Sequence, residues 1–457
     1  MSSAQAADPA RKLRGAWYTP PALIDIIADH VVAGDVPRRG DVVRVLDPSC
    51  GDGRMLLALG RRLRDRGLRA ELVGCDNDAA ALDSIGDPTV VTIHDDALSH
   101  DWSGEHFDIV AGNPPFLSQM AAATSRGGSS RHGGGPYADA AVEFLMLAVR
   151  LARPDGGRVA LVLPQSILGA RDAGPVRHEV DRAATLAWSW WTPRQRHFDA
   201  AVNVCVLGFE RPGGGSRQHR PWTTVVSERL GVPFVDLESL QCRGSVGDRA
   251  LLNANFRDEY YALVPAVSDD ADGPPLVTSG LIDPGVCRWG DVPVTFARRS
   301  HAAPRVDLSK LTGRFVDWAD RKLVPKVLVA NQTRILEAVA DPEGEWLPGV
   351  PVNTVTPHDR NPRSVWQIAA VLTSPVASAI AWHHAAGTGL STTSMRIRPG
   401  VLAAVPWPSG ELSEAVAALA SGHIAECGEL VTAAYGLGGD TASELITWWT
   451  AQLGGAA

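Results

Sequence analysis

The chain has 457 residues, of which 45% are hydrophobic and 21% charged, a composition typical of a globular protein with two or three domains and a large buried core. Its six cysteines are scattered without a CxxC pair, which argues against a zinc site or a disulfide scaffold and favours a reducing cytosol. The formal net charge of -8 argues modestly against a nucleic-acid partner, yet residues 298–334 hold nine Lys or Arg against three Asp, which is compatible with a local basic stripe.

The amino terminus lacks the charged and then apolar pattern of a signal peptide, and no window approaches the run of about 20 apolar residues that a membrane span needs. After a flexible tail at 1–14, the first predicted element is a helix. Thr19 is suited to cap this helix and Pro20 to occupy its first turn. The apolar positions at helical spacing are Leu23, Ile26, Ile27 and Val31.

From residue 42 the chain alternates predicted strands with predicted helices. The strands are 42–47, 71–76, 89–96, 107–113 and 158–164, and the helices are 54–66 and 138–152. Such alternation predicts an α/β fold with a doubly wound, mostly parallel sheet that helices cover on both faces. A late strand at 202–211 is expected near an edge of this sheet.

A Gly- and Ser-rich stretch at 118–136 follows the fourth predicted strand and has no apolar period. It is either a disordered insertion or a lid over an active site, since a doubly wound fold places its site at the carboxyl ends of the strands.

The rhythm of strands and helices fades after about residue 215, and a domain boundary is expected near residue 240. In the second half, 326–330 is predicted as a strand and 365–382 as one apolar helix with Pro375 inside it. A short Pro-containing strand is expected within 402–408.

The most informative segment runs from the strand that ends in Asp47 through a tight turn with Gly51 and Gly53 into a helix. Glycines let a ligand approach the backbone closely. A dinucleotide fingerprint needs a third Gly where Leu56 stands, so an NAD or FAD site is the weaker interpretation. Asp76 ends the second strand, 29 residues after Asp47, and is suited to hold ribose hydroxyls or, alternatively, to cap a helix.

Two further motifs follow the third and fourth strands. Asp95 and Asp96 end the third strand, where one of them could accept a hydrogen bond from an adenine amine. Asn113-Pro114-Pro115-Phe116 ends the fourth. An amide side chain, an adjacent carbonyl and an aromatic ring form a receptor for a planar amine, although a tight turn could produce the same tetrapeptide.

These motifs, in this order, resemble those of N6-adenine DNA methyltransferases, and the upstream segment 15–20 resembles the one that precedes their cofactor loop. Cofactor motifs come first, the catalytic motif next and the recognition region last, which is the gamma-type order of the group that contains TaqI methyltransferase. The resemblance implies a class I methyltransferase, Rossmann-like catalytic domain at 15–240, an α+β target-recognition domain at 241–457, and S-adenosyl-L-methionine as cofactor.

Carried over to this chain, the resemblance assigns a cofactor role to Thr19 and Asp47 at the methionine end and to Asp76 at the ribose. The other residues that it implies for the cofactor are Cys50, Gly51, Gly53, Asn77, Asp96, Ala97, Asn113 and Phe144. Phe116 and Phe198 are implied to stack against the target base, with Asn113, Pro114, Pro115 and Phe116 as the catalytic motif.

The implied chemistry is methylation of a poorly nucleophilic amine. If the Asn113 side-chain oxygen and the Pro114 carbonyl accept its two hydrogens, the nitrogen lone pair localises and can attack a sulfonium methyl group. Because an adenine inside a duplex is out of reach, it must be flipped out. No metal is needed, and the chain has no GxSxG, HExxH or P-loop motif.

In the second half, the candidates for contacts with double-stranded DNA are Arg298, Arg299, Asn331, Gln332, Arg334, Arg396 and Arg398. A separate nuclease or specificity subunit in a restriction-modification or phage-defence system is compatible with this organisation. Two alternatives stay open: an RNA-adenine or protein-glutamine methyltransferase, which uses the same type of amine receptor, and a methyltransferase-fold module that binds DNA or a partner without catalysis.

Overall fold

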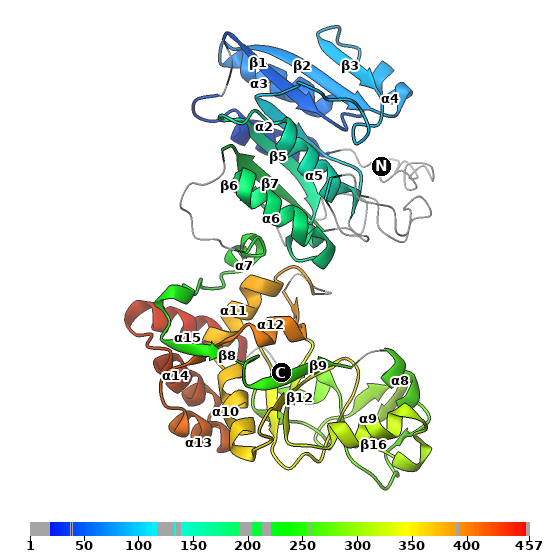
Figure 1. Ribbon diagram of the computed structural model, residues 1–457, viewed down its shortest axis with the longest axis vertical. Helices are drawn as coiled ribbons and strands as arrows, with labels where there is room; N and C mark the ends of the chain where they lie inside the picture. Colours follow the sequence, from blue (N-terminus) through cyan, green and yellow to red (C-terminus); the bar gives the residue numbers. More distant parts are fainter. Residues whose placement is uncertain are drawn as a thin grey trace, which may run out of the picture. The chain divides into compact units, whose positions relative to one another are not determined.

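The computed structural model describes residues 19–36, 38, 40–116, 132–133, 139–191, 203–212, 221–255, 257–389, 391 and 393–453. The chain divides into two compact units, Met1–Val225 and Val226–Ala457. The division falls earlier than the boundary expected near residue 240. Each unit is described by itself below (Figure 1).

The N-terminal unit is built on a seven-stranded sheet with the order β3-β2-β1-β4-β5-β7-β6. The strands are β1 (Val42–Asp47), β2 (Arg69–Asp76), β3 (Val90–His94), β4 (Ile109–Gly112), β5 (Arg158–Pro164), β6 (Thr185–Trp190) and β7 (Val204–Glu210). The first five run parallel, and β7 runs antiparallel between β5 and β6. The predicted doubly wound, mostly parallel sheet is thereby confirmed.

Helices cover both faces of this sheet, because its central strands are buried on both sides. The helices are α2 (Pro21–Val31), α3 (Arg54–Asp65), α4 (Ala79–Asp83), α5 (Ala140–Leu151) and α6 (Gly174–Ala183). On one face, α2 and α3 share a core with Val45 and Ile109. The α5 helix contacts β4, β5 and α6, and is drawn beside β5 in Figure 1.

Two details of the N-terminal unit were not predicted from the sequence. The α2 helix has Pro20, not Thr19, at its N-cap, and no side chain caps it, because the fixed φ of Pro20 and Pro21 already sets the first turn. The late strand β7 lies near an edge, as expected, but the edge position itself is taken by the half-buried strand β6, which was not predicted.

The C-terminal unit contains an antiparallel sheet of β9 (Ala250–Ala254), β17 (Lys326–Ala330), β19 (Ala338–Asp341) and β21 (Val352–Pro357). Its helices are α8 (Arg257–Leu263), α9 (Arg314–Lys322), α10 (Pro362–Leu372), α11 (Pro375–Ala385), α12 (Pro399–Ala403), α13 (Ser413–Ala420), α14 (Ile424–Ala434) and α15 (Gly439–Leu453), and α7 (Thr224–Arg229) lies across the division between the units.

Short paired strands complete this unit: β8 (Cys242–Ser245), β10 (Val267–Ser268), β11 (Leu276–Val277), β12 (Ile282–Asp283), β13 (Val286–Cys287), β14 (Val294–Phe296), β15 (Arg299–His301), β16 (Arg305–Val306), β18 (Gln332–Thr333), β20 (Leu347–Pro348), β22 (Met395–Arg396) and β23 (Pro406–Pro408). Together with the helices they make an α+β unit.

The single apolar helix expected at 365–382 is wrong. The segment forms two helices, α10 and α11, bent by 65°. Pro375 lacks a backbone N–H and occupies the first turn of α11, while the Ser374 side chain accepts a hydrogen bond from the backbone N–H of Ala377 as its cap. In the described part of the chain no single helix has the length and apolarity of a membrane span, and α10 and α11 meet that test only as a bent pair.

Candidate functional site

The loop between β1 and α3 is shaped by two glycines in the left-handed region, Gly51 with φ of 51° and Gly53 with φ of 74°. Other residue types adopt this conformation at a cost. A Cβ atom placed on Gly51 would meet nothing within 4 Å, so open space faces the backbone there. The loop can therefore take a ligand against its main chain.

Asp76, at the end of β2, ties this loop to the neighbouring strand. One of its carboxylate oxygens accepts a hydrogen bond from Gly51 N at 2.8 Å, and the other accepts one from Asp78 N at 3.0 Å. A carboxylate offers about four lone-pair sites, so two remain for ligand hydroxyls. Asp76 thus lies where the sequence predicts a ribose-binding group, and it also orders the loop.

Asp47, at the end of β1, is 2% exposed and accepts a hydrogen bond from Ser49 N at 3.0 Å. Burial raises the pKa of its carboxyl to about 7, and the charge of Asp76 adds to this, against the lowering effect of the Ser49 backbone. A Cβ on Gly112 would lie 2.3 Å from Asp47 Oδ1, so this carboxyl packs directly on the end of β4.

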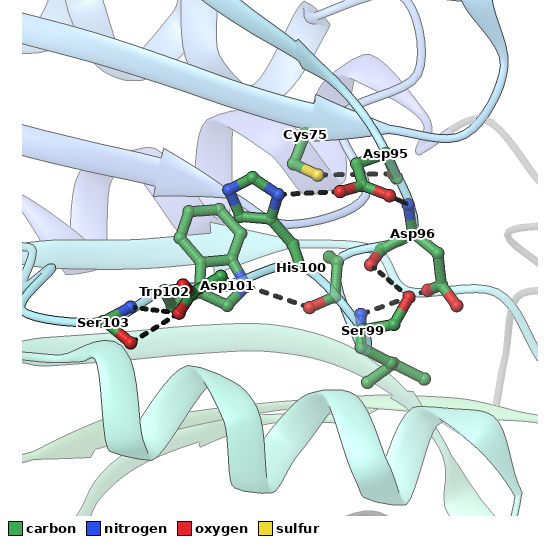
Figure 2. Close-up of polar contacts among 10 residues, drawn as sticks. Cys75, Asp95, Asp96, Ser99, His100, Asp101, Trp102 and Ser103 are labelled. Atoms are coloured by element: carbon green, nitrogen blue, oxygen red, sulfur yellow. Dashed lines mark hydrogen bonds and ion pairs between the residues drawn. The ribbon is translucent and has the colours of Figure 1, made fainter.

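A polar turn follows β3 (Figure 2). Asp95 Oδ1 accepts from Asp96 N and its Oδ2 lies 2.8 Å from His100 Nδ1, while Asp96 Oδ1 accepts from Leu98 N at 3.1 Å. The His100 hydrogen bond, followed by that from Asp96 N, lowers the pKa of Asp95. Asp96 is exposed at the same edge of the sheet as Asp47 and Asp76, because the strands run parallel.

Two residues of this turn were missed by the sequence reasoning. His100 pairs with Asp95, and Trp102 donates from its indole Nε1 to the carbonyl of Ala97 at 2.9 Å. Their rings lie 4.6 Å apart in an edge-on arrangement. A His five residues after an acidic strand end is the only signal in the sequence, and such spacing alone is weak. Ala97 itself is buried, with 3% exposure, so only its backbone is open to a role here.

The segment Asn113-Pro114-Pro115-Phe116 follows β4 directly, as predicted. Pro114 is buried, and Asn113 and Phe116 are half-buried; Phe116 packs against the core beneath the sheet. The parallel pairing of β4 with β1 brings this segment to the edge that carries Asp47. An amide, a carbonyl and an aromatic ring therefore lie beside the glycine loop.

The remaining residues predicted to bind the cofactor differ in burial. Thr19 and Cys50 are buried, and Cys50 N donates to the carbonyl of Cys75 at 3.0 Å, which joins the loop to β2. Asn77 is exposed, whereas Phe144 is buried on α5 with 5% exposure. Phe198, the second aromatic expected against the base, and most of the stretch 118–136 lie outside the described residues.

The charge at this edge selects for ligand type. Carboxylates stand at the ends of β1, β2 and β3, which repels a pyrophosphate and favours a ligand with hydroxyls and positive charge. These residues fit an adenosyl ligand that bears a sulfonium and an ammonium group. Among the residues that the structure describes, no cluster of three or more His, Cys, Asp or Glu could hold a metal ion.

The predicted DNA contacts fall into two groups within the C-terminal unit. Arg298 and Arg299 are exposed on the hairpin of β14 and β15, where Arg298 has a φ of 64°. Gln332 pairs with Arg396 where β18 meets β22, and Arg334 and Arg398 are exposed on the flanking residues. The two groups thus belong to separate pairs of short strands.

The expectation that Asn331 reads base edges is wrong. Its side chain is 7% exposed, and its amide donates to the carbonyl of Ile397 at 2.8 Å, so it is committed to the interior. His383 on α11 is a core residue, because it is buried with its ring within hydrogen-bond distance of Ser227 Oγ and the Pro233 carbonyl.

Comparison with known proteins identifies relatives of the N-terminal unit. Residues 4–212 match the family described as N-6 DNA Methylase. The chain is 30% identical over 144 residues to a type II methyltransferase, M.BanIII of Aneurinibacillus aneurinilyticus, which is 25% of this chain and 24% of that protein. It is 25% identical over 181 residues to the modification methylase CviBIII of Paramecium bursaria Chlorella virus NC1A, or 39% of this chain and 46% of the relative.

The chain thus spans less than half the length of these curated relatives. Among solved structures, the methyltransferase subunit of a type I restriction-modification system from Streptococcus thermophilus is 19% identical, with a TM-score of 0.36 over 45% of this chain and 46% of that one. TrmN from Thermus thermophilus is 18% identical, with a TM-score of 0.28 over 42% of this chain and 48% of that one.

Proposed function

We propose that the N-6 DNA methylase domain in residues 4–212 of this chain transfers a methyl group from S-adenosyl-L-methionine to the N6 amine of an adenine in DNA. The observation that carries the proposal is the position of Asn113-Pro114-Pro115-Phe116. This amine receptor directly follows β4, at the same sheet edge as the glycine loop and the carboxylates of Asp47 and Asp76.

The strand ends of β1 to β3 hold the cofactor in this proposal. Asp76 accepts hydrogen bonds from the ribose hydroxyls while it keeps its hydrogen bond from Gly51 N. Asp96 accepts a hydrogen bond from the amine of the cofactor's adenine. Asp47 would hold the methionine end of the cofactor, whose positive charge would favour the ionised form of this carboxyl. When bound, S-adenosyl-L-methionine supplies an electrophilic methyl group on a positively charged sulfur.

Asn113 and Pro114 prepare the nucleophile. Their oxygens accept the two hydrogens of the target amine, which localises the nitrogen lone pair and aims it at the methyl group. Phe116 stacks on the target ring and presents its π face to the positive charge. The proton that the amine loses passes to solvent through these acceptors, and no step requires a metal.

The target base must leave the duplex to reach this receptor, so the enzyme needs a DNA-binding surface that offsets the cost of unstacking. The C-terminal unit supplies it in this proposal, with Arg298, Arg299, Arg334, Arg396 and Arg398 on phosphates. A restriction-modification role, with a separate nuclease or specificity subunit as partner, is part of the proposal because one relative is named a type II methyltransferase and another a modification methylase.

The test is transfer of labelled methyl groups from the cofactor by the full chain to unmethylated duplex DNA, with RNA and a protein extract in parallel. The proposal expects label in DNA alone. Label confined to RNA or to protein would contradict it and favour the other substrates of this amine receptor. Tight cofactor binding without label in any acceptor would instead indicate a required partner or a non-catalytic module.

A further inference from the structure

The orientation of the Asp96 carboxylate depends on the shape of the turn that follows β3 (Figure 2). One oxygen, Oδ1, accepts a hydrogen bond from Leu98 N at 3.1 Å, inside the turn. Within the described parts of the chain, the other oxygen, Oδ2, accepts no hydrogen bond, and the residue is exposed. Asp96 therefore offers a ligand one acceptor, and the turn sets the direction of that acceptor.

The neighbouring Asp95 fixes the backbone at Asp96. Asp95 Oδ1 accepts a hydrogen bond from Asp96 N at 2.8 Å. The backbone of Asp95 is tied to the end of β2, because its N–H donates to the Asp76 carbonyl at 3.1 Å and its carbonyl accepts from the Cys75 thiol at 3.4 Å. The Asp95 side chain is 48% exposed, however, so packing alone does not hold its rotamer.

His100 supplies the contact that holds this rotamer. Its ring nitrogen Nδ1 lies 2.8 Å from Asp95 Oδ2. Because the pKa of Asp95 is lowered, first of all by this hydrogen bond, the carboxyl is ionised at neutral pH and Nδ1 must carry the hydrogen. The Asp95 carboxylate is thus held through both of its oxygens, one by His100 and the other by Asp96 N.

Trp102 holds the imidazole of His100 in its place. The two rings meet edge-on with their centroids 4.6 Å apart, and the indole Nε1 donates to the Ala97 carbonyl at 2.9 Å. On its other side, the indole meets the ring of Phe107, which is 1% exposed, at a centroid distance of 6.1 Å. The imidazole is therefore supported from the interior, and the turn is organised before a ligand arrives, which reduces the entropy cost of binding.

We propose that His100 is a positioning residue for the adenine of the cofactor: through Asp95 it sets the backbone at Asp96 and so aims the Asp96 carboxylate at the adenine amine. The inference rests on the proposed function, which assigns that amine to Asp96. Without the His100 contact, the Asp95 carboxylate rotates and Asp96 N loses its acceptor. The ribose contact is not affected, because Asp76 keeps its own hydrogen bond from Gly51 N.

The test is equilibrium binding of two ligands to the full chain, measured by calorimetry. One ligand is S-adenosyl-L-homocysteine, and the other is its analogue in which purine, without the 6-amino group, replaces adenine. The parent chain should prefer the adenine ligand by about tenfold or more, the value of one hydrogen bond to a charged group. His100→Leu, which has no donor, should lose most of this preference and bind the purine analogue as the parent does.

Two control variants separate positioning from a general loss of structure. His100→Asn keeps an N–H donor close to the position of Nδ1, so it should restore the preference for adenine. His94→Leu removes an exposed imidazole that influences Asp95 through its charge, and it should leave the preference unchanged. Because the pair of His100 and Asp95 is partly exposed, His100→Leu should melt near the temperature of the parent chain.

A double variant tests whether His100 acts through Asp96. Asp96→Asn keeps an oxygen for Leu98 N but turns an amide donor toward the adenine amine, so it should abolish the preference by itself. Adding His100→Leu should then change the affinity for neither ligand, because two residues that act through one contact are not additive. A further loss of affinity in the double variant would overturn the inference, as would a His100→Leu variant that keeps the preference of the parent.

Methyl transfer by the same preparations separates this inference from the proposed function. If the parent chain has no preference for adenine, the assignment of Asp96 and this inference both fail. If the preference depends on His100 but no methyl group reaches DNA, the proposed function fails while the inference stands. If the parent methylates DNA and His100→Leu prefers adenine as strongly as the parent does, the inference alone is wrong.

Discussion

Asn113 carries the proposed chemistry through one oxygen atom, so its removal should separate binding from catalysis. We predict that Asn113→Ala lowers methyl transfer by about 100-fold or more, the usual loss when one charge-stabilising group of an active site is removed. Cofactor affinity should change by less than about threefold, because the loop and Asp76 are untouched. Equilibrium cofactor binding and single-turnover transfer measure the two quantities. Equal losses in both would make Asn113 a structural residue.

Asp47 should give the N-terminal unit a pH-dependent stability. Its pKa is about 7 when folded, against an ordinary value of 3.8, so between roughly pH 4 and pH 7 the folded state holds a proton that the unfolded state releases. The bound proton stabilises the folded state relative to the unfolded state. The free energy of unfolding therefore decreases as pH rises through that window.

The variant Asp47→Asn mimics the protonated group and lacks this loss. We predict that the free energy of unfolding of Asp47→Asn, measured in urea and taken relative to that of the parent chain, is higher at pH 8 than at pH 5. Parallel pH profiles of the two proteins would show that Asp47 is not the group responsible. Cofactor affinity of the variant should fall at pH 8, where the parent carboxylate is charged.

At the scale of elements, the close packing of β4 on β1 depends on one glycine. A methyl group at Gly112 would lie 2.3 Å from Asp47 Oδ1, so Gly112→Ala must push the strand ends apart. We predict a decrease of about 1–3 kcal/mol in the free energy of unfolding, as for other overpacked interiors, together with weaker cofactor binding. The control is Gly400→Ala, where a methyl group meets nothing within 4 Å. Equal stability of the two variants would contradict the proposed packing.

The elements that sequence predicts well are those whose pattern is local. The strands β1, β5 and β17 have the predicted bounds, because an uninterrupted apolar run between turn signals specifies a buried strand. The α10–α11 pair was predicted as one helix because its apolar pattern is continuous, and only the Ser374-Pro375 cap reveals the break.

The candidate site, like the fold, was predicted only where the signal is local in the sequence. The order of acidic strand ends and the Asn113 motif were predicted from sequence, since parallel strands bring their carboxyl ends to one edge. Three contacts could not be predicted, because each depends on side-chain geometry across the sheet. They are the hydrogen bond between Asp76 and Gly51, the close approach of Gly112 to Asp47, and the pairing of His100 with Asp95. Asn331 illustrates the converse, a polar residue whose burial no local pattern reveals.

At the scale of the whole molecule, the structure has two compact units, Met1–Val225 and Val226–Ala457, and the proposed function requires catalysis from the first and DNA recognition from the second. The second unit was the harder to predict, because its short strands pair with partners far along the chain, as β8 does with β23. Pairing of that kind leaves no local period in the sequence.

The exposed hairpin of β14 and β15 tests this assignment. We predict that Arg298→Glu combined with Arg299→Glu weakens DNA binding and lowers the slope of log Kobs against log salt by about one for each phosphate that the protein no longer neutralises. Arg360→Glu combined with Arg363→Glu, two exposed arginines next to the start of α10, is the control that changes net charge by the same amount. Binding titrations at several salt concentrations measure the slopes, and the same slope in both variants would move the DNA surface elsewhere.

The most direct test of the central claim is mass spectrometry of the nucleosides released from unmethylated duplex DNA after incubation with the full chain and S-adenosyl-L-methionine. We expect N6-methyldeoxyadenosine from the parent chain and its near absence with Asn113→Ala. N4-methyldeoxycytidine in its place, or an equal yield from both proteins, would contradict the assignment of an adenine amine to the receptor that follows β4.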